Sequence, residues 1–125
     1  PLLITGGSQQ SPDWVAENGD GWITYPRNVA AQVQVIADYR ARVRAAGQTD
    51  KPVVQSLYVD LLPERDAAPR PIHLGFQAGT DFLRTYLREI QALGVNHVAL
   101  NLRFNQLPID TALEHLADFV LPDFS

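Results

Sequence analysis

Short apolar runs alternate with segments of helical periodicity along almost the whole chain of 125 residues. The apolar runs have the β-branched and aromatic composition of strands, and the intervening segments place apolar residues on one helix face. We therefore predict strands at 2–5, 21–25, 52–60 and 95–103, and helices at 12–19, 29–46, 81–93 and 111–121. Strands that alternate with helices pair in parallel through right-handed crossovers. The predicted fold class is α/β, with four parallel strands and four helices, as in half of an eight-stranded βα barrel or a small open sheet.

Residues that start and stop helices flank these segments. Ser, Thr, Asp and Asn side chains cap helix N-termini, whereas glycine and proline end helices. The expected caps are Ser11, Asn28, Thr80 or Asp81, and Asp110, and the expected stops are Gly19, Gly47, Gly94 and Pro122. In the second helix the apolar face is expected to consist of Val29, Val33, Ile36 and Val43.

Residues 61–79 contain three prolines and two glycines and show no regular pattern, apart from a possible short piece at 72–76. We predict a loop there. A loop of this length inside a compact domain is unusual and often functional. It could help to cover a binding site.

The first eleven residues, Pro-Leu-Leu-Ile-Thr-Gly-Gly-Ser-Gln-Gln-Ser, form a short apolar strand, a glycine turn and the start of a helix. Such a turn can bind an anion, because glycines let the backbone approach a phosphate and unpaired N–H groups point at it. The alternative is a tight turn that requires glycine only for its backbone angles.

The charge and composition exclude several classes of function. The formal net charge is −4, there is one lysine (Lys51), and no basic face is formed, so nucleic acid is not an expected partner. No apolar run approaches the roughly 20 residues of a membrane span. There is no cysteine, hence no disulfide and no thiolate metal site. We expect a cytoplasmic protein without a membrane partner.

The chain begins with Pro1 and contains no methionine. We therefore expect residue 1 not to be the natural start, and residues 1–125 to be a single partial domain from the C-terminal part of a longer protein.

Several segments resemble the bacterial luciferase-like, flavin-dependent monooxygenase family. They are Pro-Leu-Leu-Ile-Thr-Gly-Gly-Ser-Gln at 1–9, Ala-Glu-Asn-Gly-Asp-Gly-Trp at 16–22, Leu-Gly-Val-Asn-His-Val-Ala-Leu at 93–100 and Leu-Ala-Asp-Phe-Val-Leu-Pro at 116–122. The family has a Gly-Gly-Ser turn, an Asp-Gly-Trp entry to the next strand, a Gly-Val-x-His-Val strand and a final helix ending at Leu-Pro. Each piece is common, but their order and spacing across the chain are more specific.

The resemblance implies the C-terminal half of a (βα)8 TIM barrel, with strands five to eight present and the first four absent. It implies an oxidoreductase, a monooxygenase that uses reduced FMN from a separate reductase, with a small-molecule substrate. Gly6, Gly7, Ser8 and Gln9 would then hold the cofactor phosphate. The isolated chain would be inactive and would pair with the missing half or with a second copy, forming a homo-oligomer.

Further candidate residues follow the predicted strands, where barrel active sites lie. Tyr25, Arg27, Arg103 and Phe104 could line a substrate pocket; the alternatives are surface charge for the arginines and simple packing for the aromatic residues. The three histidines, His73, His97 and His115, do not have metal-ligand spacing, so no metal site is predicted. No catalytic residue is assigned.

Two alternatives remain open. One is an oxidoreductase of the same superfamily that uses the deazaflavin F420 and the same phosphate turn. The other is a non-enzymatic α/β module that binds a phosphorylated ligand or a partner protein.

Overall fold

The computed structural model describes residues 1–124. The contacts of the chain gather in two compact units. Unit 1 consists of Pro1–Ser56 with Ile90–Ala99, and unit 2 consists of Leu57–Glu89 with the residues from Leu100 onward. Each unit is described separately.

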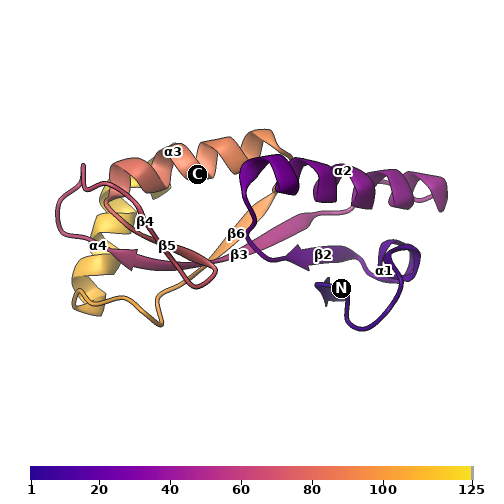
Figure 1. The fold of residues 1–125 in the computed structure, drawn as a ribbon, viewed down its shortest axis with the longest axis horizontal. Coiled ribbons are helices and arrows are strands. Elements are labelled where there is room, and N and C mark those ends of the chain that lie inside the picture. The colour runs from indigo at the N-terminus through magenta and orange to yellow at the C-terminus, as the bar shows by residue number, and fades with distance from the viewer. Residues whose placement is uncertain (125) are drawn as a thin grey trace. The chain divides into compact units, whose positions relative to one another are not determined.

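Unit 1 contains a small parallel sheet and two helices (Figure 1). The elements are β1 (Leu3–Thr5), α1 (Pro12–Asn18), β2 (Gly21–Thr24), α2 (Val29–Ala45) and the start of β3 (Val53–Leu61). β1 pairs in parallel with β2, and β2 pairs in parallel with β3, which also pairs with β6 (His97–Asn101). These are the four predicted strands, and the predicted parallel pairing of the first three is confirmed.

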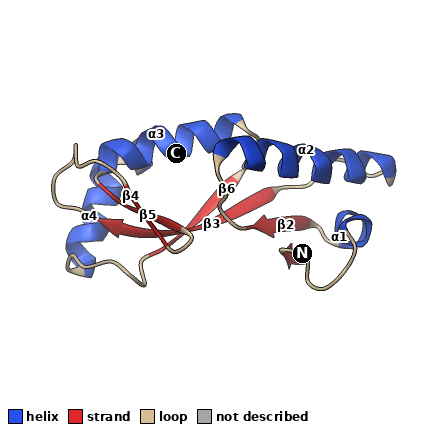
Figure 2. Cartoon of the chain, viewed as in Figure 1, coloured by secondary structure: helices blue, strands red, loops and turns tan. Residues whose placement is uncertain are grey.

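The core of unit 1 lies between the sheet and α2, which runs along β2 (Figure 2). Ile4, Trp22 and Val53 are in register on the sheet and are all buried. On α2 the buried residues are Gln32, Ile36, Tyr39 and Val43. The prediction that Val33 lies on this face is wrong, since Val33 is 39% exposed. The buried face includes the polar residues Gln32 and Tyr39, so the apolar pattern alone did not locate it.

The predicted caps are confirmed for α1 and α2 but not for the last helix. The side chains of Ser11 and Asn28 accept hydrogen bonds from the N–H groups of Trp14 and Ala31. The prediction of a cap at Asp110 is wrong: α4 (Ile109–Phe119) begins after Pro108, with no side-chain cap. The fixed φ of a proline at this position allows it to precede a helix even though it has no side chain that could cap the helix.

Unit 2 contains two strands that the sequence did not predict. Within residues 61–79 lie β4 (Arg70–Ile72) and β5 (Gly75–Ala78), so the prediction of a simple loop is wrong. β5 pairs in parallel with the second part of β3 and antiparallel with β4. At Gly75 an added Cβ would lie 1.8 Å from the Tyr58 carbonyl oxygen, so glycine is required for the close approach of β5 to β3.

The helices of unit 2 are α3 (Thr80–Ala92), α4 and a 3₁₀ turn at Leu121–Asp123. Edge-to-face contacts join Phe76 of β5 to Phe82 and Tyr86 of α3, with ring centroids 5.0 Å apart in each pair. This packing holds the unpredicted strand β5 against α3. Among residues 1–124, no helix has both the length and the apolar character to cross a membrane.

Candidate functional site

The turn between β1 and α1 has an unusual backbone. Gly6 has φ +55°, and Ser8 and Gln9 have φ +46° and +58°, a region that non-glycine residues seldom adopt. The turn is fixed from both sides, since the Gly6 N–H donates to the Ile23 carbonyl and Trp22 Nε1 donates to the Gly6 carbonyl, each at 2.8 Å. Non-glycine residues at positive φ persist only where the surroundings impose them.

The N–H groups of Gly7, Ser8 and Gln9 have no hydrogen-bond partner among the described residues. Successive unpaired N–H groups in a turn form a concavity that suits an anion. The Ser8 hydroxyl donates to the Thr5 carbonyl at 2.8 Å, so its proton is already engaged. The start of α1 adds little, because Pro12 lacks an N–H and that of Trp14 is capped by Ser11. The free donors therefore belong to the turn.

A pocket of about 470 Å³ opens beside this turn in unit 1. It lies at the C-terminal ends of β1 and β2 and extends between α1 and α2. Its lining comprises Gly6, Gly7, Gln10, Pro12, Val15, Trp22, Tyr25, Arg27, Gln34, Val35, Asp38, Tyr39 and Arg42. Four residues proposed from sequence thus meet at one pocket: Gly6, Gly7, Tyr25 and Arg27. Ser8 and Gln9 lie next to it in the turn but do not line it.

A buried polar network holds Arg27 beside the pocket. Arg27 Nη1 donates to Thr24 Oγ1 at 2.6 Å, to the Tyr25 carbonyl at 3.0 Å and to Gln32 Oε1 at 3.0 Å. Gln32 Nε2 donates in turn to Gln55 Oε1 at 2.8 Å. Thr24, Gln32 and Gln55 are at most 1% exposed. The donors at Nε and Nη2 of Arg27 have no partner among residues 1–124 and remain available to a ligand.

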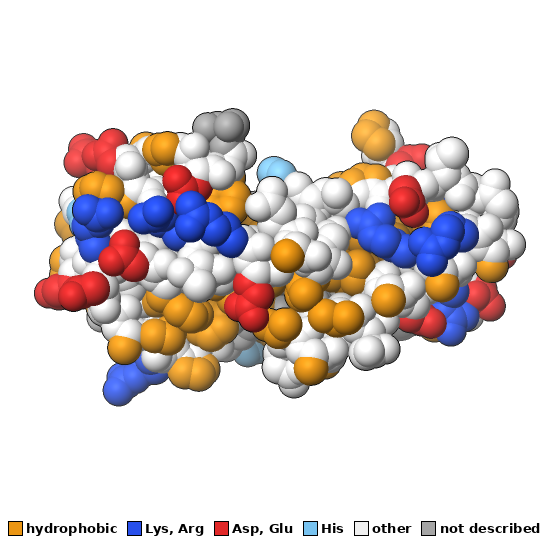
Figure 3. Space-filling model, turned by 90° about the horizontal axis from the view of Figure 1, so that it is seen from above, with side chains coloured by type: hydrophobic (Ala, Val, Ile, Leu, Met, Phe, Trp, Pro, Cys, Tyr) orange, Lys and Arg blue, Asp and Glu red, His pale blue; other side chains and the backbone are white. Residues whose placement is uncertain are grey.

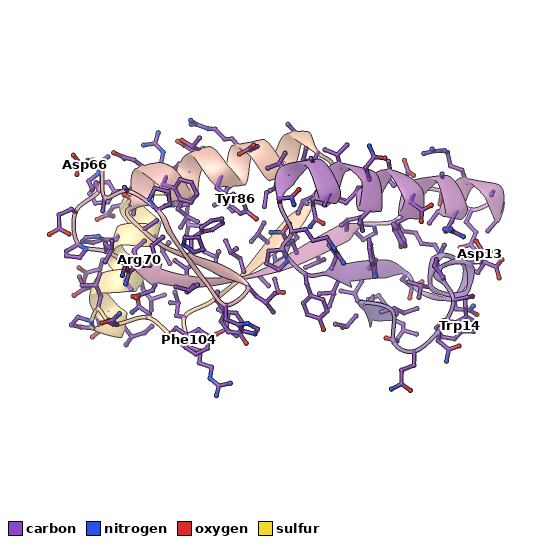
Figure 4. The ribbon with its side chains drawn as sticks, in the orientation of Figure 1. Asp13, Trp14, Asp66, Arg70, Tyr86 and Phe104 are labelled. Atoms are coloured by element: carbon purple, nitrogen blue, oxygen red, sulfur yellow. The ribbon has the colours of Figure 1, made fainter. Side chains whose placement is uncertain are left out.

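The charged groups at the α1 side of the pocket are paired with one another. Arg42 donates to Asp38 Oδ2 at 2.8 Å and to Asp13 Oδ1 at 2.7 Å; Asp13 is labelled on α1 in Figure 4. Hydrogen bonds to Asp38 and then Asp13 raise the pKa of Arg42 above its ordinary value. Figure 3 shows the same mixing of basic and acidic side chains over α2. Arg42 is therefore a poorer anion ligand than Arg27.

The other two proposed residues, Arg103 and Phe104, belong to unit 2 and do not line this pocket. The Phe104 ring lies 4.9 Å from that of Tyr58, and the Arg103 guanidinium carbon lies 5.7 Å from the Phe104 ring centre. Tyr58 also lies 6.0 Å from the His73 ring. These residues form an aromatic cluster that joins Tyr58 of β3, His73 between β4 and β5, and the segment after β6.

A buried carboxylate, Asp60, lies near the end of β3 in unit 2 and is 3% exposed. It accepts hydrogen bonds from Gln77 Nε2 at 2.8 Å, from the Gln106 N–H at 3.0 Å and from Gln106 Nε2 at 2.7 Å. No cation contacts it, and no group of three or more potential metal ligands occurs among the described residues. Sequence reasoning did not select the glutamines at 32, 55, 77 and 106. Gln32 and Gln55 are buried, and only their position in or next to apolar runs could have indicated this, whereas Gln77 is half-buried and Gln106 is exposed.

The comparisons with known proteins agree on the fold. Over 100% of its length the chain superposes on the coenzyme F420-dependent tetrahydromethanopterin reductase of Methanopyrus kandleri, with a TM-score of 0.78 and 13% identity, covering 51% of that chain. An F420-dependent secondary alcohol dehydrogenase, solved with an F420–acetone adduct, matches 97% of this chain with a TM-score of 0.72 and 12% identity, covering 48% of its own length. No family model matches the sequence, and no curated protein matches it.

The fold is thus that of half of a TIM barrel of the luciferase-like type, as the sequence resemblance implied. The chain spans about half the length of the solved structures it matches. Parallel strands with the helices α1 to α4 build this half, and β4 adds a short antiparallel strand.

Proposed function

We propose that the chain is one half of an oxidoreductase barrel that binds a phosphate-bearing redox cofactor, with F420 as the first candidate. The observation that carries the proposal is the turn at residues 6–9, where three successive N–H groups without partners among residues 1–124 lie beside a pocket lined by Arg27. The structural neighbours are described as F420-dependent, which favours F420 over FMN, the cofactor favoured by the sequence resemblance.

The residues present fit the phosphate of such a cofactor. Gly7, Ser8 and Gln9 would donate their N–H groups to phosphate oxygens, and Arg27 would add the donors at Nε and Nη2. At Gly7 nothing lies within 4 Å of an added Cβ, so the backbone is open to a ligand. When bound, the cofactor supplies hydride transfer. The chain's own contribution is to hold one end of it.

We further propose that a complementary half barrel completes the site, either as a second copy or as another part of a longer chain. Within residues 1–124, β1 pairs only with β2, which leaves its other edge unpaired in this part of the chain. Leu3 is 39% exposed on the face opposite to Ile4, where the remaining strands of a barrel would place side chains. The small-molecule substrate and the residues that act on it would belong to the completed barrel.

The test is a binding titration of the 125-residue chain with F420 and, in parallel, with FMN, followed by cofactor fluorescence. Arg27→Ala removes the cation beside the turn, and Arg44→Ala is the matched control on α2, exposed and outside the pocket. Loss of a charge-assisted hydrogen bond costs about 1.5–3 kcal/mol, so we expect F420 affinity to fall roughly 10- to 100-fold in Arg27→Ala and to stay unchanged in the control.

Equal affinities of the two variants would refute the assignment of Arg27. Absence of binding of either cofactor to the wild-type chain would refute the assignment of this turn to a cofactor phosphate. If FMN bound more tightly than F420, FMN would replace F420 as the first candidate cofactor.

A further inference from the structure

The pocket of unit 1 is larger and more apolar than a phosphate requires. Its inner wall is the stacked pair Trp22 and Tyr39, with ring centroids 4.9 Å apart and planes inclined by 26°. Val15 of α1 and Val35 of α2 lie on either side. A volume of about 470 Å³ falls in the range of small-molecule pockets. Aromatic and branched aliphatic walls suit a planar apolar group.

The Tyr39 hydroxyl is enclosed behind this wall. Tyr39 is 4% exposed, and its hydroxyl has no hydrogen-bond partner among residues 1–124. Burial raises the pKa of this hydroxyl, partly offset by the positive charge of Arg40, so it remains a donor at neutral pH. A buried donor without a partner is costly, and because this oxygen is closed to solvent, Tyr39 offers its ring and not its hydroxyl to a ligand.

The two ends of the pocket differ in charge. At one end the Arg27 guanidinium has free donors beside the Gly7 N–H. At the other end Arg42 is shared by two carboxylates, those of Asp13 and Asp38. Gln32, which contacts Arg27, and Arg42 are ten residues apart on α2, about 15 Å at the rise of an α-helix. The pocket therefore attracts an anion at the Arg27 end only.

We propose that this pocket binds a small planar aromatic ligand with one anionic oxygen group. The anionic group lies at Gly7 and Arg27, and the ring packs against Trp22 and Tyr39. The pocket lies on the face of β1 and β2 that α2 covers, so the ligand lies behind the sheet and outside a barrel interior. This inference rests on the proposed function in one respect: both place an anionic group at the turn of residues 6–9.

The experiment compares three probes by two-dimensional ¹H–¹⁵N NMR of the chain: phenyl phosphate, inorganic phosphate and phenol. The Trp22 indole N–H is the reporter, since it belongs to the aromatic wall and donates to the Gly6 carbonyl. We expect phenyl phosphate to shift this signal and to bind about tenfold more tightly than inorganic phosphate, because the ring is removed from water. Phenol is expected to bind more weakly than phenyl phosphate.

Val35→Phe fills the pocket, and Val33→Phe is the matched control on the same helix, because Val33 is exposed and does not line the pocket. We expect the first substitution to weaken phenyl phosphate about tenfold and the second to leave it unchanged. Gln34→Phe, at an exposed lining position, repeats the test if Val35→Phe loses its folded spectrum.

Equal affinity for phenyl phosphate and inorganic phosphate would overturn the aromatic site and leave the phosphate turn intact. Equal affinity for phenyl phosphate and phenol would overturn the anionic end. Phenyl phosphate binding in a chain that binds neither F420 nor FMN would support this inference while refuting the proposed function.

Discussion

Polar groups gather after strand ends in both units, but they are satisfied in one and open in the other. In unit 2 the Asp60 carboxylate accepts three hydrogen bonds and is buried. In unit 1 the turn at residues 6–9 has three N–H groups without partners, beside a pocket. Polar groups that are fully paired within the fold contribute to stability, whereas open donors at a pocket are available to a ligand. The contrast separates a structural cluster from a candidate binding site.

The largest expected effect is at Asp60. Asp60→Ala removes the buried acceptor of three hydrogen bonds, which come from Gln77 Nε2, the Gln106 N–H and Gln106 Nε2. A hydrogen bond to a charged group contributes about 1.5–3 kcal/mol, and the three contributions do not add fully because the partly exposed donors can bond to water instead. We therefore expect the free energy of unfolding to fall by about 3 kcal/mol. Urea denaturation measures it. Asp66→Ala, at an exposed position, is the control and should change stability by no more than about 0.5 kcal/mol.

If Asp60→Ala lowered the free energy of unfolding no more than the control Asp66→Ala does, the structural role of Asp60 would be contradicted. Binding of phenyl phosphate to unit 1, measured on the folded fraction of Asp60→Ala, should remain at the wild-type affinity. A change there would break the separation between the two regions.

An intermediate effect is expected at Gln32, which is structural and also supports the pocket. Gln32→Leu removes an acceptor from Arg27 and a donor from Gln55, both close to the end of β2. We expect a loss of about 2 kcal/mol of stability, since a buried polar network is broken. Because Arg27 keeps Thr24 and the Tyr25 carbonyl as partners, affinity for inorganic phosphate should fall only severalfold. Unchanged affinity would show that Gln32 does not position Arg27.

Local sequence signals predicted the elements of unit 1 because short-range chemistry fixes them. Asn28 caps α2 through the Ala31 N–H, and Gly47 ends it at φ +74°. The buried stripe of α2 was predicted only in part, since it includes Gln32 and Tyr39, whose burial depends on partners across the sheet. Hydrophobic periodicity cannot identify a polar residue that is buried because it is paired.

Long-range contacts explain what the sequence did not predict in unit 2. β5 contains Gly75, which the close approach to Tyr58 requires, and no local pattern indicates that approach. Asp60 and Gln106 are 46 residues apart in sequence. By contrast, Gly6, Gly7, Tyr25 and Arg27 could be placed together in advance, because the C-terminal ends of parallel strands meet at one edge.

The smallest effect is expected at Tyr39, where a buried polar atom has no hydrogen-bond partner among residues 1–124. Tyr39→Phe removes a hydroxyl without a partner, so stability at neutral pH should be unchanged or rise by up to about 1 kcal/mol.

Burial raises the pKa of Tyr39 in the folded state above the ordinary value of 10.0. The unfolded chain then loses this proton first, so stability falls as pH rises from 10.0 towards the raised pKa. Urea denaturation of both proteins at neutral pH and above pH 10.0 should show a smaller decline in Tyr39→Phe than in the wild type. Destabilisation of Tyr39→Phe at neutral pH would mean that the buried hydroxyl has a hydrogen-bond partner, which would contradict its assignment as an unsatisfied donor.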